Sequence, residues 1–325
     1  MIDRNNHKYN YRKGSDKLIN EDEILRVLPL DISSEIKGYL INESLQEIRI
    51  KANKPIIVNL SNKEVILDRS ATTNDLKQIL VRISNYSLYA YEEEIKQGYI
   101  TVKGGHRIGM AGECVISQGE VKTIRNISSI NMRICREVKG SSNEIMKFIV
   151  SNDRVYNTLI ISPPKCGKTT ILRDMARNIS NGMPINNLTG KKVSIIDERS
   201  EIASCFNGVP QLDVGIRSDI LDNCFKKDGM IMAIRSLSPE VLICDEIGTD
   251  GDIEALNMAF NSGVNIVVTI HGYNIDDVYK RNVFKDLLEK SILERIVVLS
   301  SRRGPGTIEN IYSIGTGGEF KCLKW

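Results

Sequence analysis

The sequence lacks the features that mark three common classes of protein. Its formal net charge is only +3 over 325 residues, so no global electrostatic field argues for a nucleic-acid partner. Its seven cysteines are scattered without a paired Cys-x-x-Cys spacing, which argues against a structural zinc site and fits reduced thiols in a cytosol. No apolar run is long enough to span a bilayer, and the N-terminus lacks the apolar core of a signal peptide. We therefore expect a soluble cytoplasmic protein without a membrane span.

The composition is that of an ordinary globular protein, with 41% apolar and 26% charged residues. A chain of this length favours two domains over one. Residues 1–20 hold five Lys/Arg against two Asp and almost no apolar periodicity, which predicts a flexible basic tail. The polar, turn-rich stretch 139–143 is the best linker. We therefore expect an N-terminal α+β domain at 21–140 and a second domain at 141–325.

The N-terminal region mixes short helical and strand patterns. Alternation and turn residues predict strands, and apolar spacing of three and four residues predicts helices. Two alternating runs around Gly104-Gly105 predict a hairpin with a two-residue turn. The expected elements are helices near 21–28 and 33–41, two strands within 45–60, a helix at 73–83, a tyrosine-containing helix that ends near Gln97, the hairpin, and strands near 120–125 and 129–137.

The stretch 155–177 carries the most specific motif. An apolar run at 158–161 predicts a buried strand, a loop ending in Gly-Lys-Thr follows, and a one-sided helix begins at the end of the loop. Strand, loop and helix in this order form a phosphate-binding P-loop, where backbone N–H groups at a helix N-terminus face the phosphates. Lys168 adds a charge for the β and γ phosphates, and the Thr169 hydroxyl can bind Mg²⁺. The predicted nucleotide-binding residues are Ser162, Pro163, Pro164, Lys165, Cys166, Gly167, Lys168, Thr169 and Thr170.

Two residues of this loop depart from the common pattern. Ser162 stands where the motif has its first glycine, and Lys165 stands where glycine is common. A bulky residue at the second position is expected to need an unusual backbone conformation. These two departures from the motif could weaken or alter the affinity for nucleotide.

Acidic residues follow two further apolar runs. The run 193–196 ends on Asp197-Glu198, and the run 241–244 ends on Asp245-Glu246. The carboxyl ends of parallel strands face the ligand crevice of an open α/β sheet, so these acids are expected beside the phosphates. Asp245 can hold the metal through water, and Glu246 can orient or deprotonate the attacking water. For Asp197 and Glu198 the alternative is a cap for the next turn.

A fourth apolar strand, NIVVTIHG, ends near His271. A polar group at this strand end can sense the γ-phosphate, although a lone histidine is more often structural. The remaining patterns predict helices at 252–260 and near 275–290, a strand at 295–299 and a final hairpin at 308–323.

The order and spacing of several blocks resemble the stage III sporulation protein AA family of endospore-forming bacteria, which is related to the type II and type IV secretion and pilus ATPases. The blocks are QGYITVKGGHRIGMAGECV, PPKCGKTTILRDMAR, IDERSEIA, MIMAIRSLSPEVLICDEIGTDGDIEAL and TIHG. The resemblance covers most of the chain after about residue 20.

The resemblance implies a RecA-like P-loop ATPase core with a smaller N-terminal domain, assembled as a homo-oligomeric ring of six subunits. It implies a place at the mother-cell face of the forespore membrane, where membrane-embedded channel subunits would be partners, and ATP and Mg²⁺ as ligands. The site roles that it implies are phosphate and Mg²⁺ binding by Lys168 and Thr169, Walker B acids at Asp245 and Glu246, an acidic box at Asp197-Glu198, a histidine box at His271, and arginines acting across a subunit boundary at Arg133 and Arg136. The family usually begins its loop Gly-Pro-Pro-Gly, from which Ser162 and Lys165 depart.

Three functions remain open from the sequence. The first is an ATP-hydrolysing ring motor that works on a membrane export machine. The second is a nucleic-acid-stimulated ATPase, because RecA-like cores serve both purposes, although the near-neutral charge weighs against it. The third is a nucleotide-binding scaffold with little hydrolysis, motivated by Ser162 and Lys165.

Overall fold

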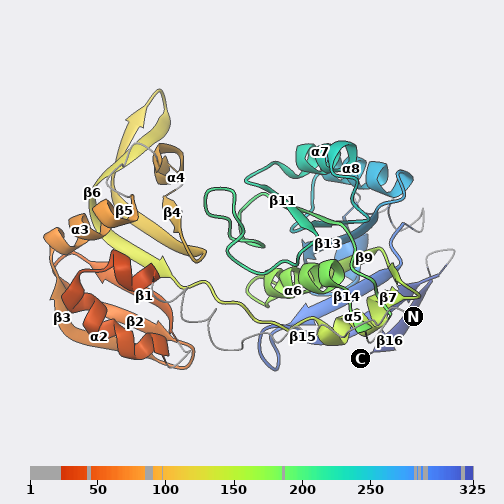
Figure 1. Cartoon of the computed structure of the whole chain (residues 1–325), viewed down its shortest axis with the longest axis horizontal. Coiled ribbons are helices and arrows are strands. Elements are labelled where there is room, and N and C mark those ends of the chain that lie inside the picture. Colours follow the sequence, from red (N-terminus) through yellow and green to blue (C-terminus); the bar gives the residue numbers. More distant parts are fainter. Residues whose placement is uncertain are drawn as a thin grey trace, which may run out of the picture. The chain divides into compact units, whose positions relative to one another are not determined.

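Figure 1 shows a computed structural model of the whole chain. The structure describes residues 23–41, 45–84, 91–96, 98–184, 187–281, 284, 287, 292–315 and 319–324. The chain divides into two compact units, Met1–Cys135 and Arg136–Trp325. The predicted tail at 1–20 and much of the predicted tyrosine-containing helix lie outside the described residues. No helix among the described residues is long and apolar enough to cross a membrane.

The first unit is built on a six-stranded antiparallel sheet of order β3-β2-β1-β6-β5-β4. Alternate residues of its strands are buried beneath helices, which forms one apolar core. The strands are β1 (Leu45–Lys51), β2 (Lys54–Leu60), β3 (Glu64–Ala71), β4 (Tyr99–Val102), β5 (His106–Ser117) and β6 (Glu120–Arg133). The helices are α2 (Leu30–Ile41), α3 (Thr73–Ile83) and α4 (Glu92–Lys96).

The β4–β5 hairpin turns at Gly104-Gly105, as predicted, but its connection is longer than two residues. Val102 pairs with His106 in the ladder, so Lys103 also belongs to the turn. Gly105 donates its N–H to the Val102 carbonyl at 3.0 Å, and both glycines have positive φ. Glycine suits both positions because it adopts a left-handed backbone conformation without steric cost.

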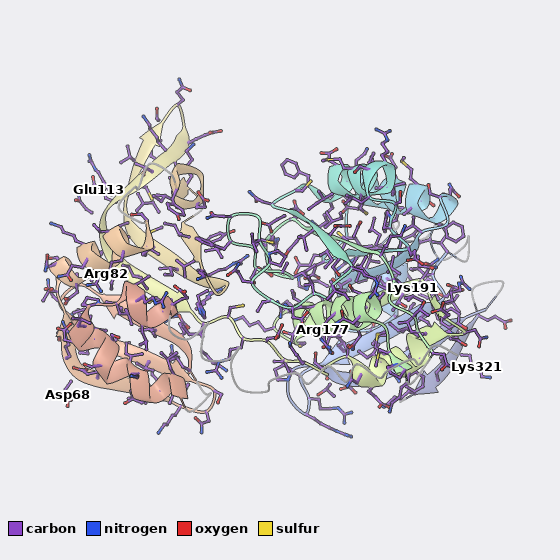
Figure 2. The ribbon with its side chains drawn as sticks, in the orientation of Figure 1. Asp68, Arg82, Glu113, Arg177, Lys191 and Lys321 are labelled. Carbon is purple, nitrogen blue, oxygen red and sulfur yellow. The ribbon has the colours of Figure 1, made fainter. Side chains whose placement is uncertain are left out.

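The prediction of two strands at 120–125 and 129–137 is wrong, because β6 is one strand. It pairs with β5 along most of its length, and the register shifts between Ala111 and Glu113 absorb the irregularity as a bulge. A Cβ on Gly112 would lie 2.6 Å from the Arg125 carbonyl, so the bulge depends on glycine. Glu113, labelled in Figure 2, accepts a hydrogen bond from Arg125 Nη2 at 2.7 Å across the two strands.

The second unit contains an eight-stranded sheet of order β11-β10-β12-β13-β9-β14-β15-β16. The first six strands in this order are parallel, and the last two run antiparallel to their neighbours. The strands are β9 (Thr158–Ser162), β10 (Val193–Asp197), β11 (Ser218–Asp222), β12 (Val241–Cys244), β13 (Asn265–His271), β14 (Arg295–Ser300), β15 (Thr307–Ile314) and β16 (Phe320–Lys324). The helices are α5 (Asn143–Ile149), α6 (Lys168–Asn181), α7 (Lys226–Ser236), α8 (Asp250–Asn261) and α9 (Asp276–Tyr279), and β7 (Val150–Ser151) pairs with β8 (Arg154–Val155).

Both faces of this sheet are covered. Leu159 and Ile161 of β9 belong to one core, which includes apolar residues of α7 and α8, and Ile160 belongs to a second core, which includes those of α5 and α6. Strands buried on both faces appear in the sequence as continuous apolar runs, which is why β9, β10, β12 and β13 were predictable. The structure adds the edge strand β11, for which the sequence analysis predicted no strand.

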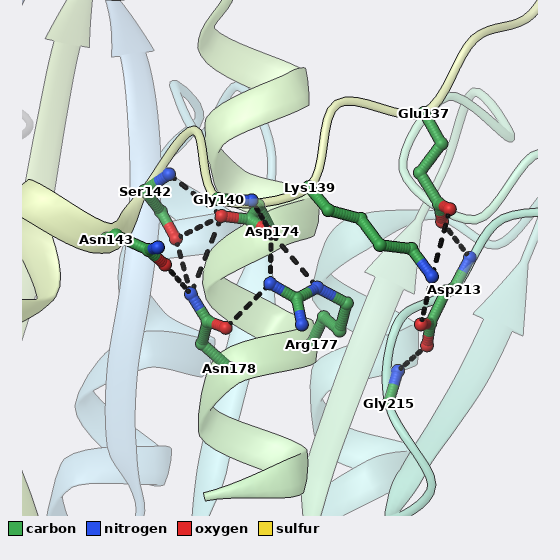
Figure 3. Close-up of polar contacts among 10 residues, drawn as sticks. All are labelled: Glu137, Lys139, Gly140, Ser142, Asn143, Asp174, Arg177, Asn178, Asp213 and Gly215. Carbon is green, nitrogen blue, oxygen red and sulfur yellow. Dashed lines mark hydrogen bonds and ion pairs between the residues drawn. The ribbon is translucent and has the colours of Figure 1, made fainter. Parts of the chain in front are cut away.

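The segment before α5 belongs to the second unit, which begins earlier than the predicted boundary at 140/141. Asp174 of α6 has only 3% of its surface exposed and accepts hydrogen bonds from the backbone N–H groups of Gly140 at 3.0 Å and Ser142 at 2.8 Å. The Ser142 hydroxyl and the Arg177 guanidinium donate to the same carboxylate (Figure 3). These bonds attach the segment to the helix that follows the P-loop.

Candidate nucleotide site

The loop between β9 and α6 has the backbone of a P-loop. Lys165 has a φ of 61° and Gly167 a φ of 81°, so the unusual conformation predicted for Lys165 is present. The helix begins at Lys168, and its first N–H groups have no partners within the helix, which makes its N-terminus suited to phosphate.

Ser162 and Cys166 are both buried in this loop. The Ser162 hydroxyl donates to the Pro163 carbonyl at 3.0 Å, so the side chain that replaces the usual glycine has a local partner. The Cys166 carbonyl accepts the N–H of Gly306 at 2.7 Å, and a Cβ on Gly167 would lie 3.0 Å from that same nitrogen. The β14–β15 turn therefore packs against the P-loop, a contact that the sequence did not predict.

The strand ends bring the predicted acids to the P-loop. In the ladder Ser162 pairs with His271, and Asp245 directly follows β12 at the same edge of the sheet. Thr169 Oγ1 donates to Asp245 Oδ2 at 2.7 Å. The buried Lys168 Nζ lies 3.4 Å from Asp245 Oδ1 and 2.9 Å from Glu246 Oε1.

The oxygens of Thr169 and Asp245 fit Mg²⁺. Magnesium is bound by few protein oxygens and completes its octahedron with water and substrate phosphates. A hydroxyl and a carboxylate that already touch, beside a phosphate-binding loop, supply that donor set. Among the described residues no group of three or more His, Cys, Asp or Glu is arranged to hold a metal.

Glu246 is the centre of an ionic cluster. His271 Nε2 lies 2.7 Å from its Oε1, where Lys168 also binds, and Arg199 Nη1 lies 2.9 Å from its Oε2. Burial would raise the pKa of Glu246, but the hydrogen bond and charge of Lys168, with the charges of His271 and Arg199, lower it below its ordinary value. The carboxylate is therefore ionised at neutral pH.

The backbone at Glu246 is also unusual. Its φ is 55°, a left-handed value that few residues with a bulky side chain adopt. Its N–H donates to Thr269 Oγ1 at 2.9 Å, and the Thr269 hydroxyl donates in turn to Asp245 Oδ1. Strained residues of this kind persist only where surrounding bonds hold them.

The two residues of the predicted acidic box differ in role. Asp197 is 2% exposed and accepts the N–H groups of Glu201, Ile202 and Ala203 at 2.8, 2.9 and 2.9 Å. Burial raises its pKa to about 6, against the opposing effect of those N–H groups. The carboxylate caps its own loop, which is the alternative that the sequence left open for this residue. Glu198 instead forms an ion pair with Lys226 of α7.

A small pocket lies at these strand ends, lined by Asp197, Glu198, Arg199, Glu201, Lys226, Asp245 and Glu246. Two of its cations, Arg199 and Lys226, were missed from the sequence. Arg199 directly follows the acidic box, which is the signal that could have indicated it, whereas nothing local in the sequence indicates Lys226.

Two arginines are expected to act across a subunit boundary. Arg133 is the exposed last residue of β6. Arg136 begins the second unit, and its buried Nη2 has no hydrogen-bond partner among the residues that the structure describes. Their role in a neighbouring subunit stays a prediction.

Comparison with known proteins decides the family. Residues 19–317 match the family described as "Sporulation stage III, protein AA". The chain belongs to this family. It is 43% identical over 293 residues to the stage III sporulation protein AA of Bacillus subtilis strain 168, an alignment that covers 90% of this chain and 94% of the relative.

Solved structures show which fold this member of the sporulation stage III AA family has. It is similar to the Yersinia pseudotuberculosis ATPase DotB, with a TM-score of 0.56 and 16% identity over 89% of this chain and 76% of that one. It is also similar to the pilus retraction motor PilT with bound ADP, with a TM-score of 0.53 and 16% identity over 89% and 80% of the two chains. The second unit has a RecA-like P-loop ATPase fold, and the chain carries an N-terminal domain as well.

Proposed function

We propose that this protein is a Mg²⁺-dependent ATPase that works as a ring motor on a sporulation-specific channel between mother cell and forespore. The observation that carries the proposal is the convergence of Lys168, Thr169, Asp245 and Glu246 at one edge of the sheet. Each of these residue types is what phosphoryl transfer from ATP requires.

The chemistry follows from these positions. Lys168, now 2.9 Å from Glu246 Oε1, would turn to the β and γ phosphates and release that oxygen. Thr169 and Asp245 would hold Mg²⁺, which neutralises charge on the phosphate oxygens. Glu246, ionised because its pKa is lowered, would accept the proton of the attacking water. His271 contacts Glu246 Oε1. Through this contact it would sense whether a γ-phosphate is bound.

The wider setting is part of the proposal. The 43% identity to the Bacillus subtilis protein supports a role in sporulation, and the similarity to DotB and PilT supports a secretion-type motor. We infer a homo-oligomeric ring of six subunits on the mother-cell face of the forespore membrane. Its partners would be membrane-embedded channel subunits, and Arg133 and Arg136 would act on a neighbouring subunit's nucleotide.

The test is phosphate release by the purified chain, measured with its mass in solution with and without ATP and Mg²⁺. We expect turnover that rises with oligomer formation and is lost in Glu246→Gln. Glu254→Gln on α8 is the matched control, because Glu254 is 68% exposed and pairs only with the surface residue Lys227 in the described part of the chain. Turnover of the wild-type oligomer no greater than that of Glu246→Gln would contradict the motor.

A nucleotide-binding scaffold is the second candidate. It is favoured by Lys165, which adopts a left-handed φ of 61° at a loop position where glycine is common. Calorimetry with ATP and Mg²⁺ separates the two: binding without turnover supports the scaffold. Stimulation of turnover by added DNA or RNA would instead support a nucleic-acid motor.

A further inference from the structure

Arg199 contacts the centre of the site, but the sequence analysis predicted no role for it. It lies in the loop that follows β10, and its Nη1 is 2.9 Å from Glu246 Oε2. We propose that Arg199 is a positioning residue that holds the Glu246 carboxylate for its work on water, and that buried Asp197 fixes the loop that carries Arg199. The inference rests on the proposed ATPase function.

The two oxygens of the Glu246 carboxylate have different partners. Lys168 and His271 both contact Oε1, whereas Arg199 contacts Oε2. When Lys168 turns to phosphate, Oε1 loses its buried cation and can accept a hydrogen bond from water. Arg199 stays bound to Oε2, so the carboxylate keeps its orientation and the positive charge of the guanidinium beside it.

Contacts of the Glu246 backbone alone do not fix the position of its carboxylate. Its left-handed φ of 55° and its N–H bond to Thr269 fix the main chain, but the side-chain torsions of a glutamate stay free unless its oxygens are bound. A misplacement of about 1 Å can cost roughly a hundredfold in rate. A guanidinium on the oxygen that does not meet water limits such movement without blocking the reaction.

The loop that carries Arg199 is held from two sides. Asp197 accepts the N–H groups of Glu201, Ile202 and Ala203, which closes the chain around its carboxylate. From α6, the buried Arg173 donates to the carbonyls of Glu201, at 2.6 Å, and Ile202. The P-loop helix and the Arg199 loop are therefore one connected body, so Arg199 keeps its place relative to Lys168 and Thr169 at the start of that helix.

The competing explanation is a surface ion pair without a role. The Arg199 side chain is 67% exposed, and exposed pairs contribute little to stability. The two explanations therefore differ in their effects: a surface pair changes neither stability nor rate, whereas a positioning residue changes the rate and leaves the stability intact.

The experiment compares Arg199→Gln and Arg199→Lys with the exposed control Arg235→Gln on α7, measuring kcat, KM for ATP and melting temperature. For Arg199→Gln we expect kcat to fall about tenfold to a hundredfold, with KM within about twofold and an unchanged melting temperature. Arg199→Lys should recover part of kcat, because it keeps a positive charge at this position.

The role of Asp197 is tested by Asp197→Asn alone and with Arg199→Gln. If Asp197 acts through Arg199, the double variant should be no slower than the slower single variant, whereas multiplied losses would overturn that part. A kcat of Arg199→Gln within twofold of an active wild type would overturn the positioning role and leave the ATPase standing. Wild-type turnover equal to that of Glu246→Gln would overturn both.

Discussion

Removal of the Asp174 carboxylate should destabilise the second unit through its link to the segment 137–143. Oδ1 accepts bonds from Gly140 N–H and the Arg177 guanidinium, and Oδ2 accepts them from the N–H and hydroxyl of Ser142. In Asp174→Ala these buried donors lose their acceptor and Arg177 loses its counter-charge. Breaking a buried pair in this way costs about 3–5 kcal/mol.

The assay is thermal unfolding of the full chain. For a unit of this size each kcal/mol shifts the melting temperature by about 2–4 °C, so the expected decrease is about 6–20 °C. The control is Asp213→Asn, which removes a contact to the same segment. The Asp213 side chain is 37% exposed and accepts from Lys139 at 2.9 Å, and such a surface pair is worth at most about 1 kcal/mol. A decrease for Asp174→Ala no larger than that for Asp213→Asn would refute the reasoning.

The same contacts predict a pH dependence. Burial would raise the pKa of Asp174, but the N–H groups of Ser142 and Gly140, the Arg177 side chain and the Ser142 hydroxyl together lower it. A carboxyl whose folded pKa is lowered stabilises the fold above its unfolded pKa of about 3.9, and this contribution is lost as pH falls through the folded pKa. The difference between wild type and Asp174→Ala should therefore shrink in acid.

Three further predictions concern single residues. Lys165→Gly relieves a left-handed φ of 61°, so it should raise the free energy of unfolding by about 0.5–1 kcal/mol in denaturant titration; a loss would contradict this. Because burial raises the pKa of Asp197 to about 6, wild-type stability should fall as pH rises from about 4 to 6, and Asp197→Asn should remove that slope. Gly112→Ala places a Cβ 2.6 Å from the Arg125 carbonyl and should destabilise the first unit by about 1–3 kcal/mol, whereas Gly38→Ala in α2 has open space and should stabilise it by up to about 1 kcal/mol.

The predictable parts of the fold have strong local patterns. The P-loop strand and β12 are continuous apolar runs buried on both faces, and topology alone places the residue after each run at the same edge of the sheet. Edge strand β11, SDILD, has one exposed and four half-buried residues, so its sequence carries neither an apolar run nor a strict alternation. The continuity of β6 was missed because its bulges interrupt the alternation that identifies a strand.

The parts of the site that escaped prediction depend on contacts between distant segments. Gly306 meets Cys166 because β14 and β9 are neighbours in the sheet, and no local pattern reveals this pairing. Arg199 looks like any charged loop residue until its loop is closed by Asp197. Asp197 itself was placed correctly at a strand end, but local pattern could not distinguish an acid that faces the ligand from one that caps its own loop.

Helix α6 connects these features into one mechanical unit. Its first residues, Lys168 and Thr169, hold the phosphate-binding groups. One turn later Arg173 bonds to the carbonyls of the Arg199 loop, and its neighbour Asp174 bonds to the segment that leads in from the first unit. Successive helical residues project about 100° apart, so two adjacent side chains reach two different segments. Because both sets of bonds are buried and charge-assisted, any shift of α6 would carry the Arg199 loop and the segment 137–143 with it, or break bonds that cost several kcal/mol. If nucleotide binding moves this helix, we therefore expect the Arg199 loop and the start of the second unit to move with it.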